Sequence, residues 1–168
     1  TKKGGGFFGL SCFLVEKNSP GLIIGEKIEK MGLRTSPMAE LGFNNCKVPA
    51  NNLVGEEGAG GLLFSSSMEW ERGLILAHGV GIMDRLLSDC QNYVRTRKIS
   101  GQPISSHQSI SHKLAEMKVR VETSRLLLYK AAWCKAMKKQ ATLETSLAKL
   151  SISESYIENC RTAMQIYG

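Results

Sequence analysis

The chain has 168 residues, 42% of them hydrophobic and 22% charged, which is a composition typical of a globular protein and has no apolar run long enough for a membrane span. Five dispersed cysteines without a CxxC pair argue against a disulfide framework or a zinc site, so no metal is expected. The net charge of +7 favours anionic partners, but the basic residues are scattered, and their densest cluster, 135–139, is typical of a solvated helix end, so nucleic-acid binding is not expected.

Residues 1–54 carry the pattern of β-structure. Apolar segments at 10–15, 22–30 and 38–48 are separated by turn signals, among them Asn18-Ser19-Pro20-Gly21. Three short strands joined by tight turns are typical of part of an antiparallel sheet or barrel.

Beyond a glycine-rich loop at 55–61, apolar residues recur every three or four positions, which indicates helices. The pattern predicts one long helix that ends at 98–103, a second from about Ser106 to Lys138 with Ser105 or Ser106 as N-cap, and a third from Thr142 to about Tyr167. Such helices pack as an antiparallel bundle, so we expect an α+β fold with a boundary near 55–61.

Each predicted helix has a set of apolar residues expected to face the core. The three sets are Met68, Ile75, Val80, Met83, Leu86 or Leu87, Cys90 and Val94; Ile110, Leu114, Met117, Val121, Leu128 and Ala132; and Leu143, Leu147, Leu150, Ile157, Cys160 and Met164.

The most informative segment is Met68-Glu69-Trp70-Glu71-Arg72, at the start of the first predicted helix. Charges drawn toward a core are costly unless they are paired or used, so this turn either faces water or lines a pocket. Glu69 and Arg72 lie three residues apart, which allows a surface ion pair of small energetic value. Glu71 is open to two interpretations, a catalytic carboxylate or an acidic residue favoured by the dipole of a helix N-terminus.

Six segments, in order along almost the whole chain, resemble motifs of the acyl-CoA dehydrogenase family. They are 13–21 (FLVEKNSPG), 30–37 (KMGLRTSP), 48–55 (VPANNLVG), 97–104 (RKISGQPI), 107–117 (HQSISHKLAEM) and 165–168 (QIYG). By this resemblance, residues 1–55 are the C-terminal part of the middle β-domain, and residues 56–168 are an incomplete C-terminal helical bundle domain. The chain is then a fragment of a longer protein, inactive by itself.

The resemblance implies an oxidoreductase that uses FAD to dehydrogenate the α,β bond of an acyl thioester, either an acyl-CoA or an acyl group on a carrier protein, in fatty acid or amino acid catabolism. It further implies an electron-transferring flavoprotein as acceptor, a homodimer or homotetramer, and a place in the bacterial cytoplasm or the mitochondrial matrix. A second hypothesis, of a different functional class, is that the chain is a non-catalytic helical assembly module that keeps the family fold.

The resemblance also implies roles for individual residues. Glu71 matches the catalytic base of isovaleryl-CoA dehydrogenase-like members, whereas most relatives place the base farther downstream. Arg72 would support the base, and both Arg72 and Glu69 would bind the substrate, with Glu69 near the thioester arm. The residues matched to FAD contacts are Arg97, His107, Gln108, Gln165 and Gly168. Read without the resemblance, Arg97 is a charge at a helix C-terminus.

Overall fold

A computed structural model of the chain describes residues 3–168, which divide into two compact units that meet between Ser65 and Ser66. Each unit is described by itself. Among the described residues, no helix has both the length and the apolar character that crossing a bilayer requires.

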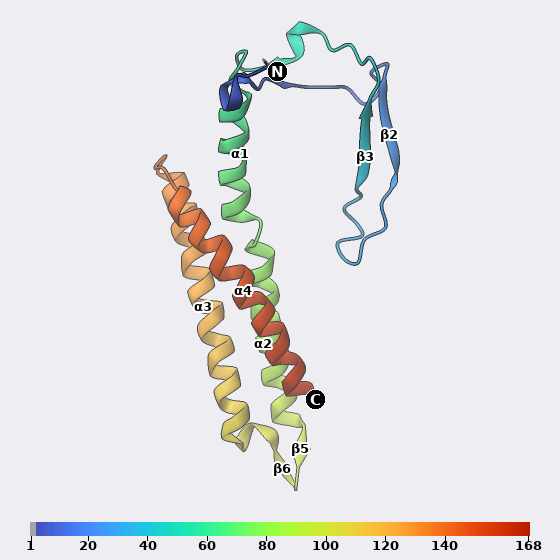
Figure 1. The fold of residues 1–168 in the computed structure, drawn as a ribbon. Coiled ribbons are helices and arrows are strands. Elements are labelled where there is room, and N and C mark those ends of the chain that lie inside the picture. Colours follow the sequence, from blue (N-terminus) through green and yellow to red (C-terminus); the bar gives the residue numbers. More distant parts are fainter. Residues whose placement is uncertain (1–2) are drawn as a thin grey trace. The chain divides into compact units, whose positions relative to one another are not determined.

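The first unit is built from two small antiparallel ladders. One pairs β1 (Cys12–Phe13) with β4 (Leu53–Val54). The other pairs β2 (Leu22–Lys27) with β3 (Ala39–Phe43), which lie side by side in Figure 1. Short 3₁₀ segments occupy Gly6–Gly9 and Ala50–Asn52. The antiparallel arrangement expected from the sequence is therefore present, with strands shorter than the apolar segments and with β4 in addition.

The turn before β2 depends on a glycine. Gly21 has φ of +86°, and a Cβ at this position would lie 2.3 Å from the carbonyl oxygen of Asn44. A residue with a side chain would therefore meet both a backbone strain and a clash. Most strand side chains of this unit remain exposed, Ile23 at 56% and Phe43 at 61%, so this part of the chain has little core of its own.

The second unit is a bundle of long helices. Its elements are α2 (Ala77–Thr96), the hairpin strands β5 (Lys98–Ile99) and β6 (Gln102–Pro103), a 3₁₀ turn (Ile104–Ser106), α3 (Gln108–Ala136) and α4 (Thr142–Tyr167). Helix α1 (Gly60–Leu74) begins in the first unit and ends in the second. Helices α2 and α4 run in one direction and α3 runs in the other, which is the expected antiparallel bundle (Figure 1).

The bundle core contains mostly aliphatic and sulfur-containing side chains, with one buried amide among them. The fully buried members include Met83, Cys90, Val94, Met117, Val121 and Ile152. The amide of Asn159 is also fully buried; its Nδ2 donates to the carbonyl of Met117 (3.3 Å), and its Oδ1 accepts from Arg120 (3.4 Å). Both polar atoms of the Asn159 side chain are therefore hydrogen-bonded within the bundle.

Two helix boundaries differ from the expectation. The single long helix predicted after residue 61 is two helices, because the chain leaves helical geometry at Ile75 and Leu76. The N-cap of α3 is His107, one or two residues later than predicted, because Ser106 turns its hydroxyl back to the carbonyl of Pro103 (2.8 Å) in the preceding 3₁₀ turn.

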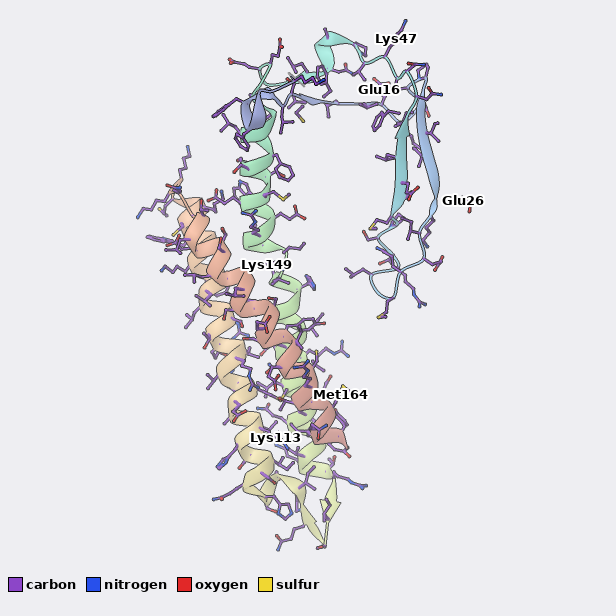
Figure 2. All side chains as sticks on the ribbon, in the orientation of Figure 1. Glu16, Glu26, Lys47, Lys113, Lys149 and Met164 are labelled. Atoms are coloured by element: carbon purple, nitrogen blue, oxygen red, sulfur yellow. The ribbon has the colours of Figure 1, made fainter. Side chains whose placement is uncertain are left out.

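The buried face of α4 differs more from the expectation than any helix boundary does. Most of the predicted inward residues are exposed, among them Leu143 at 66%, Leu150 at 65% and Met164 at 70%, while small residues such as Ala148 and Thr145 are buried. Met164 can be located on α4 in Figure 2. The reason is that small side chains let α4 approach α2 and α3 closely. Five larger apolar residues remain exposed on the outer side of α4, whereas Ile152 and Ile166 are buried together with the small residues. The exposed five are Leu143, Leu147, Leu150, Ile157 and Met164.

Candidate functional site

The charged segment 68–72 lies in the last two turns of α1, not at a helix start. Helix α1 begins at Gly60 and ends at Leu74, so Glu71 is three residues from its C-terminus. A carboxylate there faces the negative end of the helix dipole. The interpretation of Glu71 as an N-terminal carboxylate favoured by the dipole is therefore wrong for this helix.

The carboxylate of Glu69 is held by groups from two other helices. Its Oε1 accepts from the backbone N–H of Ala141 (3.1 Å) and from the hydroxyl of Thr142 (3.0 Å). Its Oε2 accepts from the ammonium of Lys135, near the end of α3. The pair is largely enclosed, since the side chain of Glu69 is 18% exposed and that of Lys135 is 12% exposed. Glu69 thus pairs with Lys135 across the bundle, and not with Arg72 as the sequence allowed.

These contacts stabilise the charged form of the carboxylate. The hydrogen bond from Lys135 is the main reason that the pKa of Glu69 falls below its ordinary value, and the donors of Thr142 and Ala141 lower it further against the effect of burial. The ammonium of Lys135 also lies 4.8 Å from the ring centroid of Trp70, which is 50% exposed. Trp70 therefore covers the ion pair from the solvent side and is not part of the core.

One turn after Glu69, the backbone of α1 touches α4. A Cβ added to Gly73 would lie 2.8 Å from Cγ2 of Thr145. Glu69 and Gly73 are four residues apart and share one face of α1, which is the face docked on the first turn of α4. Glu71 lies about 200° around the helix axis from Glu69, so it belongs to the opposite face. Both Glu71 and Arg72 are exposed.

Four of the five residues matched to FAD contacts line one cavity of about 320 Å³. Arg97, His107, Gln165 and Gly168 come from the end of α2, the start of α3 and the end of α4. Gln108 is the first residue of α3 and is exposed beside this lining. The described part of the chain contains no carboxylate paired with Arg97. A free guanidinium, an imidazole and an amide together form a donor set suited to phosphate oxygens.

Local structure holds these residues in place. Arg97 is the C-cap of α2, and its N–H donates to the carbonyl of Tyr93 (2.8 Å). The ring of Tyr93 packs on that of Tyr167 with centroids 4.3 Å apart, and its hydroxyl donates to the Tyr167 carbonyl (3.4 Å). Both rings line the same cavity, and burial raises the pKa of the Tyr167 phenol. The end of α4 is thereby fixed next to the end of α2.

The β5–β6 hairpin adjoins this cavity. Ser100 and Gly101 form its tip, with φ of +51° and +83°. Two successive positive φ values are the backbone of a tight two-residue hairpin turn. The sequence indicated only a helix break here, since Ser100 is not a residue that usually signals such a turn.

The charged end of α1 and the cavity lie at opposite ends of the bundle. Glu69 binds the first residue of α4, and Gln165 is close to its last, so roughly 35 Å of helix separates them at 1.5 Å per residue. One chain therefore does not bring Glu71 and Arg97 to the same small site.

The residues of these two groups that sequence reasoning missed include Gly73, Tyr93, Lys135, Ala141 and Thr142. Lys135 belongs to a basic cluster interpreted as a solvated helix end, and only its distance in space to Glu69, 66 positions away in sequence, distinguishes it. Residues 3–168 contain no cluster of three or more His, Cys, Asp or Glu side chains arranged to hold a metal ion.

Comparison with known proteins gives consistent results. Residues 58–168 match the family described as the acyl-CoA dehydrogenase, C-terminal domain. The L-prolyl-[peptidyl-carrier protein] dehydrogenase of Pseudomonas fluorescens is 40% identical over 163 residues, which is 97% of this chain and 43% of that protein. The chain thus spans about two fifths of this relative's length.

Two solved structures resemble the chain closely. The crystal structure of the prolyl acyl carrier protein oxidase AnaB is 48% identical with a TM-score of 0.94, over 97% of this chain and 43% of that one. The FAD complex of PigA is 39% identical with a TM-score of 0.95, over 100% of this chain and 44% of that one.

Proposed function

We propose, from the premise that this chain belongs to the acyl-CoA dehydrogenase family, that its parent protein is an FAD-dependent enzyme that dehydrogenates the α,β bond of an acyl thioester. The observation that carries the proposal is the match of residues 58–168 to the family's C-terminal domain, together with the clustering of Arg97, His107 and Gln165 around one cavity. In this proposal residues 1–55 are part of the middle β-domain and residues 56–168 are part of the C-terminal domain.

Glu71 is the proposed catalytic base. Its carboxylate takes the proton from the α-carbon while the β-hydrogen leaves with its electron pair, so the substrate loses two electrons and two hydrogens and gains a C=C bond. Bound FAD would supply the acceptor for this hydride. Arg72, the next residue on the exposed side of α1, supports the carboxylate by its positive charge.

The residues of the cavity fit the nucleotide part of FAD. The guanidinium of Arg97 offers a fork of donors to the pyrophosphate, and His107, Gln108, Gln165 and Gly168 supply further polar contacts. Since roughly 35 Å of helix separates this cavity from the start of α4, where α1 is docked, the nucleotide held here serves the Glu71 of a neighbouring copy. A homodimer or homotetramer is therefore part of the proposal.

The proposed substrate is an aminoacyl or short acyl group on a carrier protein. Support comes from the two relatives named as acting on prolyl groups attached to carrier proteins, at 40% and 48% identity. An acyl-CoA is the second candidate, because carrier proteins and CoA present the same phosphopantetheine thioester. The proposed electron acceptor is an electron-transferring flavoprotein; molecular oxygen is the alternative, since one of these relatives is named an oxidase.

The test compares Glu71→Gln with Glu57→Gln in the full-length protein. Glu57 is an exposed carboxylate of the glycine-rich loop and serves as the matched control. Flavin reduction is followed at its visible absorbance under anaerobic conditions, with prolyl-carrier protein and butyryl-CoA as substrates. We expect Glu71→Gln to slow reduction by at least about 100-fold and the control to match the wild type.

Two results would reject parts of the proposal. Reduction at the wild-type rate by Glu71→Gln means that the base lies downstream of this chain. A full-length protein that is purified without flavin and does not take up added FAD favours the helical assembly module instead.

A further inference from the structure

Glu69 and Lys135 form the most enclosed charged pair in the described part of the chain, and the chemistry proposed above does not use Lys135. The pair sits where three helix ends meet: the end of α1, the end of α3 and the start of α4. Because both carboxylate oxygens of Glu69 already accept hydrogen bonds from the protein, this side chain is poorly available to a ligand.

Glu69 supplies the N-terminal cap that α4 lacks in its own sequence. The N-cap residue of α4 is Ala141, which has no side-chain acceptor, and its backbone N–H donates to Glu69 instead. A carboxylate is favoured at a helix N-terminus, and the cation of Lys135 is favoured in the last turn of α3. One ion pair thus satisfies two helix ends and joins both of them to α1.

These contacts hold one face of α1 close to the end of that helix. Helical geometry stops at Ile75, so α2 does not hold the last turns of α1 as a continuous rod. Glu69 and Gly73 attach one face of α1 to the start of α4, and Glu71 lies on the opposite face. Loss of the attachment lets α1 turn or shift, and Glu71 moves with it.

We propose that Glu69 is a positioning residue which, by binding Lys135 and the start of α4, orients the catalytic carboxylate of Glu71. The inference rests on the proposed function of Glu71, and it differs from the expectation that Glu69 contacts the thioester arm. A residue that contacts substrate and a residue that orients the base have different kinetic signatures.

The experiment uses the full-length protein with Glu69→Gln, Lys135→Met and Lys135→Arg. Lys138→Met is the matched control, because Lys138 is an exposed lysine at the same helix end. We measure kcat and KM for one thioester substrate, flavin content, and amide hydrogen exchange over residues 66–76. Glu71→Gln is assayed in parallel as the test of the base itself.

We expect Glu69→Gln and Lys135→Met each to lower kcat by about tenfold with little change in KM, since small misplacements of a reacting group carry penalties up to about 100-fold. Amide exchange at the end of α1 should become faster in both variants. Lys135→Arg should keep more of kcat than Lys135→Met, and Lys138→Met should match the wild type.

Two outcomes overturn the inference while leaving the proposed function intact. If Glu69→Gln raises KM and leaves kcat unchanged, and Lys135→Met has no effect, Glu69 contacts the substrate. If neither variant alters amide exchange or kcat while Glu71→Gln is inactive, the ion pair does not orient the base. A fully active Glu71→Gln, in contrast, rejects the base assignment, and the positioning role falls with it.

Discussion

Replacing Gly73 by alanine tests the close contact between α1 and α4. Alanine is favoured over glycine inside a helix by about 1 kcal/mol, so propensity alone predicts a more stable protein. The added Cβ, however, would lie 2.8 Å from Cγ2 of Thr145, which is fully enclosed at 1% exposure. Overpacking of this kind costs about 1–3 kcal/mol. We therefore expect Gly73→Ala to lower the free energy of unfolding by about 1 kcal/mol net.

Two further variants separate the contact from the propensity. Gly81 lies within α2, and a Cβ there would meet no atom within 4 Å, so Gly81→Ala should raise the free energy of unfolding by about 0.5–1 kcal/mol. Thr145→Ser removes the methyl group that Gly73→Ala would strike. In that background Gly73→Ala should become neutral or stabilising, which corresponds to a coupling energy of about 1–2 kcal/mol.

The assay is urea denaturation of the full-length protein, followed by far-ultraviolet circular dichroism, for the three single variants and the double variant. A Gly73→Ala protein as stable as Gly81→Ala would refute the reasoning, because it would mean that α1 does not rest on α4 at this residue. A penalty that persists unchanged with Thr145→Ser would place the clash elsewhere.

Three other predictions concern the charged groups. The pKa of Glu69 in the folded state lies below its ordinary value of 4.5. The ionised carboxylate therefore stabilises the folded state at pH values above 4.5, and this stabilisation is lost as the pH falls through the lowered pKa of the folded state. Thermal melts from neutral pH to about pH 3 should show the difference between wild type and Glu69→Gln shrinking with acid, and a constant difference would contradict the shift. Arg97→Ala should weaken FAD binding by about 10- to 100-fold, as measured by flavin fluorescence titration, while exposed Arg95→Ala should not. Mixed oligomers of the Arg97→Ala and Glu71→Gln variants should regain turnover, and no recovery in mixtures would argue against a site shared between copies.

Most of the fold could be predicted from the sequence, in those segments where a single physical signal determines the secondary structure. The helices α3 and α4 were predicted to within a few residues, because their apolar periodicity extends over many turns. The hairpin at 98–103 was missed, because its two-residue turn contains Ser100 in a left-handed conformation. The break at Ile75 was also missed, since Leu74, Leu76 and Ala77 around it are residues that continue a helix well.

The buried face of α4 could not be predicted from the sequence, because it depends on how the helices pack against one another. Hydrophobicity pointed to Leu143, Leu150 and Met164, whereas the bundle buries Ala148 and Thr145. Close packing between helices selects for size and shape, which a hydrophobic periodicity does not report. In the candidate site the same limit applied to Lys135, whose role depends on a partner 66 positions away.

The buried amide of Asn159 has a consequence for how α3 and α4 align. It contacts the carbonyl of Met117 and the guanidinium of Arg120, so a slide of α4 by one turn, about 5.4 Å, would leave the amide without partners in an apolar interior. Aliphatic side chains alone would tolerate such a slide at lower cost. A single polar residue therefore sets the register of the two helices, and with it the placement of Gln165 on α4 relative to His107 at the start of α3, which line the same cavity.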